Sequence, residues 1–548
     1  MRSCIPHWEE ELALDDDKDF IIQGLANGFS LVDADPGEVP NAYSPNHPSA
    51  SDPTCCHLVE ARLKEEIEDG NYVVLASQPT LTSPLAVVPK PNGDIRLIHD
   101  LSHPAGNSLN DFAQKDECHY VTIDQALQRC TPGSYMCTLD LQWAYRSIPI
   151  RADQRTLTGL SWIFKDDPNV VTYLADCRLP FGSRKSPPIF NRITQSIQRM
   201  MHRRGFHTSC YLDDFLIHAP TKAECLNGLN TLVCLLRKLG LRINWKKVCD
   251  PCQRLTFLGI QIDTVKGTLR LDPEKARALR TYISDTLSKT RLSKKQLQSL
   301  GGRLNWAANV HPWGRAYMTH IHRAIASLCL PNHKFRLTKD FIADLSWWFT
   351  CLNDDTYVRL LWDSRPCISM YCDSSSVSGG AFCHGDWLYI NWLLDRPKIA
   401  CLHINLKELA TAVEAVARWA PYYQGCCLDI FTDNMMTFFA LNNKCSSNPH
   451  GAALLKTLAG IAVNNNVTIQ GHYVKGCYND MADCISRLHA PGQSIRFLSL
   501  LTATATTCLL PDFYYLPCHM STNALCFLSS SLQRAWVTWR NWTSKWPT

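Results

Sequence analysis

The sequence has no long apolar segment free of charge. In its 548 residues, no such run reaches the ~18 residues that a membrane-spanning helix needs, and the nearest one, residues 497–511, is too short and rich in threonine. The start of the chain, MRSCIPHWEEELALDDD, lacks the basic residues and the apolar stretch of a signal peptide. We therefore expect a soluble protein of the cytoplasm, the nucleus or both, which is not secreted and has no membrane partner.

Cysteine motifs with the spacing of metal ligands are scarce as well. One CxxC occurs, at Cys249 and Cys252, and no second pair stands at zinc-ribbon spacing. In a protein that is not secreted, the 26 cysteines are expected to be reduced thiols, mostly small residues of the core. The chain also lacks internal repeats and the Asp-Thr/Ser-Gly motif of an aspartic protease.

Charge is sparse and unevenly distributed. Charged residues make up 19% of the chain and the net charge is +5, yet residues 1–70 contain 16 acidic and 4 basic residues, so the remainder carries about +17. A basic body of this kind suits a polyanion such as nucleic acid. The acidic start is expected to be a solvated, partly disordered tail. The length predicts roughly three or four domains, because one hydrophobic core does not grow to this size.

Composition and apolar periodicity divide the chain into five segments. Strands are expected at MCTLDL, SCYLDDFLIHA and LTFLGIQID, and helices at VTIDQALQRC, 187–201 and 226–239. The final SLQRAWVTWRNWTSKW has the pattern of an amphipathic helix. The segments are an acidic disordered tail and linker (1–57), a region of alternating strands and helices (58–262), a helical basic region (263–365), a second strand-rich unit (366–490) and a low-charge tail (491–548).

Two adjacent carboxylates, Asp213 and Asp214, stand between two apolar strands. The short spacing predicts a tight hairpin, although a turn chosen for its shape alone would favour Asn-Gly or Asp-Gly. Another apolar run carries Asp140, and a buried Asp is costly unless it is paired or bound to a metal. Together the three acids would hold two divalent cations ~4 Å apart for nucleotidyl transfer. Taken alone, the Asp-Asp pair could also be a solvated acidic turn.

Four motifs resemble those of reverse transcriptases, in the same order and with the same spacing. YLDD is similar to the YxDD box, LDLQWAYRSIPI to the first aspartate motif, LPFGSRKSPPIFNRI to the next motif and LTFLGIQID to the hairpin that grips the primer end. The resemblance implies an α+β right-hand polymerase, with fingers and palm over 58–262 and thumb and connection over 263–365. It predicts RNA- and DNA-directed DNA synthesis from dNTPs.

The resemblance also implies roles for individual residues. Asp140 and Asp213 would bind metal, Asp214 would complete the cluster, and Tyr145 would exclude a ribose 2′-hydroxyl unless it is an ordinary packed aromatic. The other implied contacts are with the incoming nucleotide and the nascent base pair (Lys90, Arg96, Phe181, Gly182) and with the primer end (Phe257, Leu258, Gly259). Lys90 and Arg96 could instead be exposed residues at a turn, and Lys247 is either a proton donor to pyrophosphate or a solvated lysine.

A second set of acids follows downstream, with separations of 35, 25 and 50 residues: Asp373, Glu408, Asp433 and Asp483. The first and third end apolar strands. Glu408 lies on a helix, where it could merely complete a capping box with Asn405. Asp483 could merely favour the dipole of a short helix that Asn479 caps.

As a set, these four acids resemble the active site of ribonuclease H, which has an α/β fold. The resemblance implies that they bind metal and hydrolyse the RNA strand of an RNA–DNA hybrid, which would be recognised by its shape and 2′-hydroxyls. His472, eleven residues before Asp483, matches a mobile histidine near the leaving strand. YVKG at 473–476 departs from the family, which usually has proline before the glycine. Each of the two sites would take two Mg²⁺, with Mn²⁺ as a substitute.

Other motifs indicate the kind of reverse transcriptase. IHDLSHPAGNSLND, GGRLNWAANVHPWGRAYMTHI and LSWW are similar to tyrosine-recombinase retrotransposons of the DIRS/Ngaro kind, over about residues 60–490. The last eighteen residues resemble the opening helix of the recombinase DNA-binding domain, either truncated or continued in a separate reading frame. The implied partners are an RNA template, a DNA primer, an RNA–DNA hybrid and dNTPs, together with an element-encoded recombinase.

Two other functions stay open at this point. A catalytically idle or host-adopted nucleic-acid-binding remnant would account for the missing recombinase, although all seven acidic positions are intact. A viral RNA-dependent RNA polymerase shares the palm. The ribonuclease H motifs argue against it, because an RNA-only cycle has no hybrid to digest.

Overall fold

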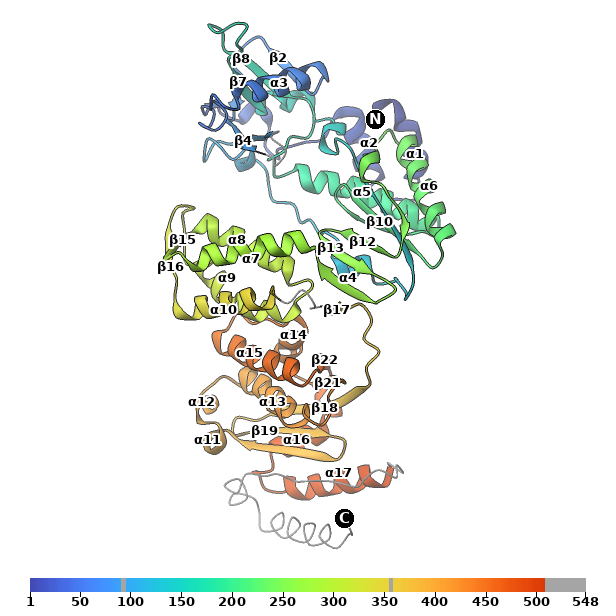
Figure 1. Cartoon of the computed structure of the whole chain (residues 1–548), viewed down its shortest axis with the longest axis vertical. Coiled ribbons are helices and arrows are strands. Elements are labelled where there is room, and N and C mark those ends of the chain that lie inside the picture. Colours follow the sequence, from blue (N-terminus) through green and yellow to red (C-terminus); the bar gives the residue numbers. More distant parts are fainter. Residues whose placement is uncertain (90–94, 354–357, 508–548) are drawn as a thin grey trace. The chain divides into compact units, whose positions relative to one another are not determined.

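The computed structural model describes residues 1–89, 95–353 and 358–507. The chain divides into two compact units, residues 1–267 and 268–548, and Figure 1 follows it through both. Each unit mixes helices with sheets, as the predicted fold class requires. None of the described helices is long and apolar enough to cross a membrane.

The first unit contains strands β1 to β13 and helices α1 to α6. The strands are β1 (Ala42–Tyr43), β2 (Tyr72–Leu75), β3 (Leu81–Thr82), β4 (Leu85–Pro89), β5 (Ile95–His99), β6 (Tyr135–Asp140), β7 (Gly159–Trp162), β8 (Thr172–Asp176), β9 (His207–Tyr211), β10 (Asp214–Ala219), β11 (Cys249–Cys252), β12 (Arg254–Phe257) and β13 (Ile260–Asp263). The helices are α1 (Ile5–Glu11), α2 (Lys18–Asn27), α3 (Cys56–Glu68), α4 (Ile123–Ala126), α5 (Ser186–Arg203) and α6 (Lys222–Lys238).

A four-stranded sheet of order β11-β6-β10-β9 forms the centre of this unit. A separate five-stranded sheet has the order β1-β3-β7-β8-β2, and β4 pairs with β5 in a hairpin. On α5, Phe190, Ile193 and Ile197 recur at helical spacing and are fully buried, in one core with Leu139 of β6 and Phe215 of β10. The predicted helices at 187–201 and 226–239 and the predicted strands therefore occur as expected, while only residues 123–126 of VTIDQALQRC are α-helical.

Residues 1–57 contain two helices, so the prediction of a disordered acidic tail is wrong. Trp8, Leu12 and Leu25 are fully buried in the core of the first unit. The Trp8 indole N–H donates a hydrogen bond to the Leu239 carbonyl at 3.0 Å. Apolar side chains that alternate with the acids thus pack the segment against the core. The high charge of the segment made this packing hard to predict from the sequence.

The acidic residues of this segment pair with basic residues of α5. Arg199 lies 2.6 Å from Asp15, and Arg204 lies 2.5 Å from Glu11. Burial opposes the ionisation of Asp15, but hydrogen bonds from Arg199, Arg203 and the Asp17 backbone, together with the charge of Arg199, hold the pKa of Asp15 below its usual value. The negative charge of the segment therefore complements basic residues of α5 and of its C-terminal end.

The second unit begins with a helical region and ends with a mixed sheet. Its strands are β14 (Thr268–Leu271), β15 (Arg291–Ser293), β16 (Lys334–Arg336), β17 (Arg359–Leu360), β18 (Cys367–Ser374), β19 (Ser378–Cys383), β20 (Asp386–Asn391), β21 (Cys427–Thr432) and β22 (Thr468–Tyr473). Its helices are α7 (Pro273–Leu287), α8 (Lys294–Ala307), α9 (Thr319–Ala326), α10 (Lys339–Cys351), α11 (Trp392–Asp395), α12 (Pro397–Ala400), α13 (Ile404–Trp419), α14 (Met435–Asn443), α15 (Pro449–Asn464), α16 (Asp480–Ser486) and α17 (Gln493–Thr507). The predicted C-terminal amphipathic helix lies outside the described residues.

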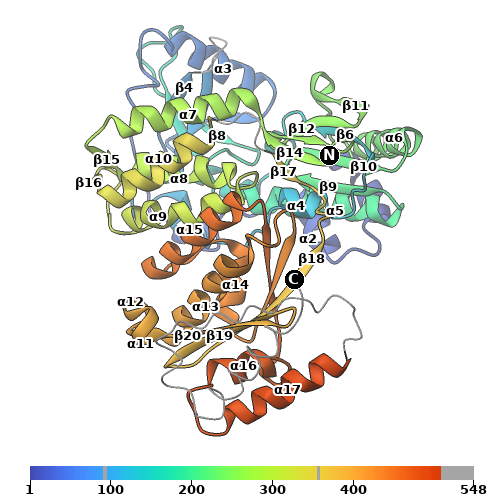
Figure 2. The same ribbon diagram turned by 60° about the horizontal axis from the view of Figure 1, so that its bottom comes forward.

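The mixed sheet has the order β20-β19-β18-β21-β22, in which β21 and β22 run parallel to β18. Two adjacent glycines in β19 show which helices cover its faces. A Cβ on Gly379 would lie 2.5 Å from Thr411 of α13, and a Cβ on Gly380 would lie 2.3 Å from the backbone nitrogen of Ser486 in α16. Because successive strand residues point to opposite faces, α13 and α16 lie on opposite sides of the sheet (Figure 2).

Replacing Trp8 by alanine tests whether the N-terminal segment is part of the folded unit. The change leaves a large cavity and orphans the Leu239 carbonyl, so we expect the free energy of unfolding to fall by about 3–5 kcal/mol. Urea unfolding monitored by circular dichroism measures this loss. Leu14→Ala, at a side chain that is 86% exposed, is the control and should change stability by less than ~0.5 kcal/mol. Equal effects of the two changes would contradict a docked segment.

Candidate functional site

The predicted hairpin brings the first three acids together. β9 and β10 pair in antiparallel fashion around the turn residues Leu212 and Asp213, with Leu212 at a φ of 55°. On the other side of β10, Asp140 stands directly opposite Asp214. The Leu141 N–H donates to the Asp213 carbonyl at 3.1 Å, which ties the turn to the end of β6. The predicted proximity of Asp140 to the hairpin is confirmed.

The three carboxylates perturb one another. Burial raises the pKa of Asp214 to about 6, and the charge of Asp213 and a hydrogen bond with Asp140 add to the effect. The pKa of Asp213 is also raised, first by burial and then by the charge of Asp140. Like charges gathered in a half-buried site stabilise a cation between them. The structure therefore favours a cation-binding cluster over a solvated acidic turn.

Two neighbouring residues hold the Asp140 carboxylate. Lys247 Nζ lies 2.8 Å from Asp140 Oδ2, and Asn244 Nδ2 donates to Asp140 Oδ1 at 3.0 Å. Lys247 is therefore paired with the cluster, although its side chain stays 63% exposed. The sequence does not predict the contact of Asn244 with Asp140, because no local pattern connects two residues that are 104 positions apart.

Tyr145 lies beside the acids, in an aromatic group. Its ring centroid is 5.1 Å from that of Phe181 and 5.2 Å from that of Phe190. Burial and the charge of Asp213 raise the pKa of Tyr145 to about 12. Phe181 is exposed, and Gly182 has a φ of 102°, where a Cβ would lie 2.3 Å from the His99 carbonyl oxygen. The predicted nucleotide-facing residues thus lie together, and their roles stay predictions.

The remaining residues predicted for the first site lie on two hairpins. Arg96 is exposed on β5, opposite Val88 of β4, and Lys90 lies outside the described residues. The predicted primer-end hairpin is formed by β12 and β13, with Leu258 and Gly259 at positive φ in its turn and Phe257 buried. The primer-end hairpin therefore occurs where the sequence predicts it.

The second site lies at one edge of the mixed sheet. Because β18 and β21 are parallel, with Tyr371 opposite Phe431, their following acids Asp373 and Asp433 come to the same edge. α13 adds Glu408, and carboxylate oxygens of the three acids lie within 4.8 Å of one another. The helix is capped by His403, so the capping-box alternative for Glu408 is wrong.

The burial of Glu408 indicates what this cluster can hold. Burial, then the charges of Asp373 and Asp433, raise the pKa of Glu408 to about 9. Its Oε2 atom is buried and has no hydrogen-bond partner among the described residues. A buried polar atom without a partner is costly, and a divalent cation bound by carboxylate oxygens would satisfy it. The three acids therefore fit a metal site.

Asp483 stands near this cluster, on α16. It pairs with Arg487 at 2.8 Å and with Arg496 at 3.3 Å, and its charge helps to raise the pKa of Asp373 after burial, the larger cause. Asn479 makes no side-chain cap on α16 but donates from Nδ2 to the Cys372 carbonyl at 3.0 Å. The predicted cap is thus replaced by a bond that fastens α16 to β18.

His472 is predicted to lie near the leaving strand, and the structure places it in a strand, while its role stays a prediction. His472 lies within β22, directly opposite Phe431 of β21, and the two rings stack with centroids 4.9 Å apart. Its Nε2 atom lies 3.1 Å from Asp429 Oδ1. Side chains of a strand alternate between its two faces, and His472 lies on the face that carries Asp429. The spacing from Asp483 alone does not predict this direction.

Comparison with known proteins bears on the first unit. Residues 88–262 match the family described as reverse transcriptase (RNA-dependent DNA polymerase). The match supports a reverse transcriptase domain. Together with the mixture of helices and sheets, it confirms the predicted polymerase fold class.

Curated relatives are retroelement polyproteins. The transposon Tf2-3 and Tf2-7 polyproteins of Schizosaccharomyces pombe (strain 972 / ATCC 24843) are each 22% identical to the chain over 438 residues, which cover 78% of this chain. The aligned part is 30% of each polyprotein, so the chain spans less than a third of their length. These relatives support a retroelement that contains a reverse transcriptase.

Solved structures of a foamy viral protease-reverse transcriptase also resemble the chain. The complex with an RNA/DNA hybrid has a TM-score of 0.49 and 16% identity, and the alignment covers 85% of this chain and 63% of that one. A complex with dsDNA has a TM-score of 0.47 and 18% identity, with coverage of 86% and 97%.

Replacing Glu408 by glutamine tests how much the ionised Glu408 carboxylate destabilises the second cluster. A carboxyl whose pKa rises from about 4.5 unfolded to about 9 folded stabilises the protein least at high pH, and its penalty grows as pH increases from 4.5 to 9. In EDTA, Glu408→Gln should therefore gain stability over the parent as pH rises, reaching on the order of 3 kcal/mol at pH 7. Urea unfolding from pH 5 to pH 8 measures the difference.

Glu414→Gln on the same helix is the matched control. Glu414 pairs with Arg396 instead of with other acids, so removing its charge should bring no gain that grows with pH. If the two glutamine variants behaved alike, Glu408 would not be held against like charges.

Proposed function

We propose that the chain is a reverse transcriptase, an RNA- and DNA-directed DNA polymerase, with a second site that cleaves the RNA strand of RNA–DNA hybrids as ribonuclease H does. The polymerase rests on the pairing of Asp140 with Asp214 beside the Asp213 turn, inside the segment that matches the reverse transcriptase family. The nuclease rests on the convergence of three carboxylates at the edge of the mixed sheet.

At the first site, Asp140, Asp213 and Asp214 would hold two Mg²⁺, which Mn²⁺ could replace. Ions bound there would lower the pKa of an attacking 3′-hydroxyl and neutralise the leaving pyrophosphate. Tyr145 would close the space that a ribose 2′-hydroxyl needs, and Phe181 and Gly182 would border the nascent base pair.

Basic and hairpin residues would position the substrates of this reaction. Arg96 and Lys90 would hold the triphosphate of the incoming dNTP. The hairpin of Phe257, Leu258 and Gly259 would support the primer end. Lys247, which is paired with Asp140, would donate a proton to the pyrophosphate as it leaves.

At the second site, Asp373, Glu408 and Asp433 would hold Mg²⁺, with Asp483 completing the set. Ser486 Oγ donates to Asp373 Oδ2 at 2.5 Å and so orients that carboxylate. Arg487 and Arg496 hold Asp483 and add positive charge beside the place where the phosphodiester of the RNA strand would lie. His472 contacts Asp429 and is assigned no step.

The helical part of the second unit would bind the phosphates of the template–primer duplex. Basic side chains of its exposed surface include Lys275, Arg277, Lys289 and Arg291. Each phosphate that they neutralise releases counterions, so binding should weaken steeply with salt. In this proposal residues 58–262 are fingers and palm, 263–365 thumb and connection, and 366–490 the ribonuclease H domain.

The motifs around residues 96–111 and 301–348 favour a tyrosine-recombinase retrotransposon of the DIRS/Ngaro kind, whose recombinase would be a further partner. An idle or host-adopted nucleic-acid-binding remnant is the second candidate. The survival of both acid clusters, with the buried and unpartnered Glu408 Oε2, favours the active enzyme, because a relic would lose such costly groups.

Two single substitutions separate the proposed activities. Asp213→Asn should reduce primer extension on an RNA template, with Mg²⁺ and dNTPs, by more than ~100-fold, since even outer-shell partners of metal ligands contribute 10–100-fold. The same variant should cleave an RNA–DNA hybrid at the parent rate. Asp433→Asn should do the reverse.

Asp250→Asn, at an exposed position, serves as the control for the loss of a carboxylate and should retain both activities. Folding of each variant is checked by circular dichroism. Loss of both activities in either site variant, without unfolding, would rule out two separate sites.

Tyr145→Val tests the proposed sugar discrimination. The smaller side chain opens space beside Asp213, so incorporation of rNTPs relative to dNTPs should rise by about 10- to 100-fold, the range over which steric fit discriminates one additional group. Single-nucleotide extension gives the ratio of kcat/KM values. Tyr43→Val, at an exposed position on β1, should leave the ratio unchanged. An unchanged ratio in Tyr145→Val would reduce Tyr145 to a packing residue.

A further inference from the structure

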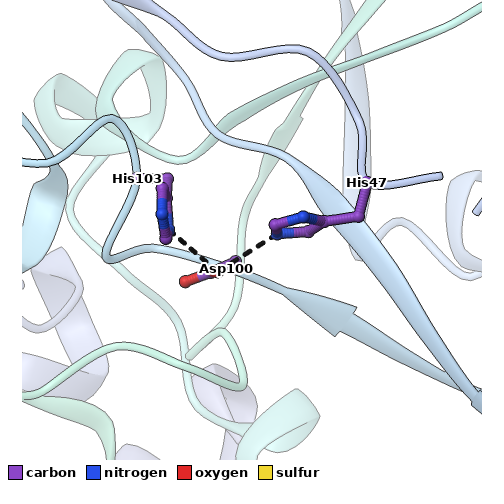
Figure 3. A group of neighbouring side chains, drawn as sticks. All are labelled: His47, Asp100 and His103. Carbon is purple, nitrogen blue, oxygen red and sulfur yellow. Dashed lines mark hydrogen bonds and ion pairs between the residues drawn. The ribbon is translucent and has the colours of Figure 1, made fainter. Parts of the chain in front are cut away.

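Two histidines and an aspartate meet on the first unit, outside both acid clusters. His47 Nε2 lies 3.2 Å and His103 Nδ1 lies 3.0 Å from the same oxygen, Oδ2 of Asp100 (Figure 3). The two imidazole rings are 5.8 Å apart and nearly perpendicular. One nitrogen or oxygen of each residue lies within 4.8 Å of the others, so the three can face a single ion.

The backbone fixes all three residues to the start of β4. His47 N donates to the Leu85 carbonyl at 2.9 Å, and Asp100 N donates to the Pro84 carbonyl at 2.9 Å. The Ser83 hydroxyl donates to the His103 carbonyl at 3.1 Å. His47 and Asp100, which are 53 positions apart in the sequence, are therefore held together by the backbone, independently of the attraction between their side chains.

The residues next to the ligands add further support. Asn46, which precedes His47, accepts from Leu85 N at 2.9 Å and donates to the Ser161 carbonyl at 2.9 Å. Ser102 N donates to Asp100 Oδ1 at 3.2 Å, which leaves Oδ2 turned toward the imidazoles. Such outer contacts orient the ligands of metal sites and set their affinity.

The donor set and spacing suit zinc. Zn²⁺ binds imidazole nitrogen and carboxylate oxygen at about 2.0–2.2 Å in a tetrahedron, which separates neighbouring ligand atoms by about 3.3 Å. The separations of 3.0 and 3.2 Å from Asp100 to the two histidines are close to that value. All three side chains are partly exposed, so water can reach a fourth position.

We propose that His47, Asp100 and His103 bind one Zn²⁺, with water as the fourth ligand. The ion joins the segment between β1 and α3 to the end of β5, and so braces the base of the β4–β5 hairpin. The site shares no residue with the two acid clusters, and its donor set is softer than their carboxylates. Excess Mg²⁺ therefore competes poorly for it, because Mg²⁺ prefers oxygen ligands alone.

The test measures Zn²⁺ on the full chain in excess Mg²⁺, which saturates the acid clusters. After dialysis against micromolar Zn²⁺ with millimolar Mg²⁺, plasma mass spectrometry should find one equivalent more zinc in the parent protein than in Asp100→Asn. Titration with Co²⁺ should give the visible absorption of a tetrahedral site. His47→Gln and Asp100→Asn should each weaken Zn²⁺ binding by about 100-fold or more, and His57→Gln, at an exposed histidine on α3, should not.

The main alternative is a carboxylate that accepts hydrogen bonds from two imidazoles and binds no ion. Asp100→Asn separates the two cases, because an amide oxygen still accepts a hydrogen bond but lacks the charge that zinc needs. Parent protein with less than about 0.2 equivalents of zinc under these conditions would overturn the proposal. So would a zinc content in both ligand variants equal to that of the parent protein.

Discussion

Both acid clusters depend on holding like charges together where water is partly excluded. Carboxylates in such positions repel each other and lose hydration, so side-chain attraction cannot assemble them. The backbone does so instead. The β6–β10 register sets Asp140 opposite Asp214, and parallel pairing of β18 with β21 brings Asp373 and Asp433 to one edge. The free energy of sheet formation and core packing offsets the repulsion.

The two clusters differ in how far the chain itself relieves this repulsion. At the first, the Lys247 ammonium and the Asn244 amide both contact Asp140, and the pKa of Asp214 is raised only to about 6. At the second, Ser486 and two arginines contact Asp373 and Asp483, while Glu408 reaches a pKa of about 9 with one oxygen left without a partner. Burial is the largest cause of both pKa shifts, and Glu408 is the more deeply buried of the two carboxyls.

The local sequence pattern predicts the structure correctly where it coincides with backbone geometry. The YLDD hairpin follows from two apolar strands with a two-residue turn, and Asp373 and Asp433 follow from strand ends in a mixed sheet. The pattern gives the wrong structure where packing between distant segments determines the conformation. The charge of residues 1–57 indicated a solvated tail, but the burial of Trp8 and its apolar neighbours holds the segment against the core. Spacing located His472 without revealing that a strand turns it toward Asp429, and neither Asn244 nor the His47–Asp100–His103 group has a local signature.

The difference between the clusters has a consequence for metal binding. A carboxyl must be ionised to bind a divalent ion, so a group with a raised pKa releases a proton when the ion arrives. At pH 7.5, a group with a pKa of about 6 is already ionised, and Asp214 releases almost none. Glu408, with a pKa of about 9, is still protonated and must give up its proton. For the two sites as proposed, affinity for a divalent ion should therefore increase with pH at the second site across the physiological range and stay nearly constant at the first. One chain can in this way hold two similar sets of acids that respond differently to the same change of pH.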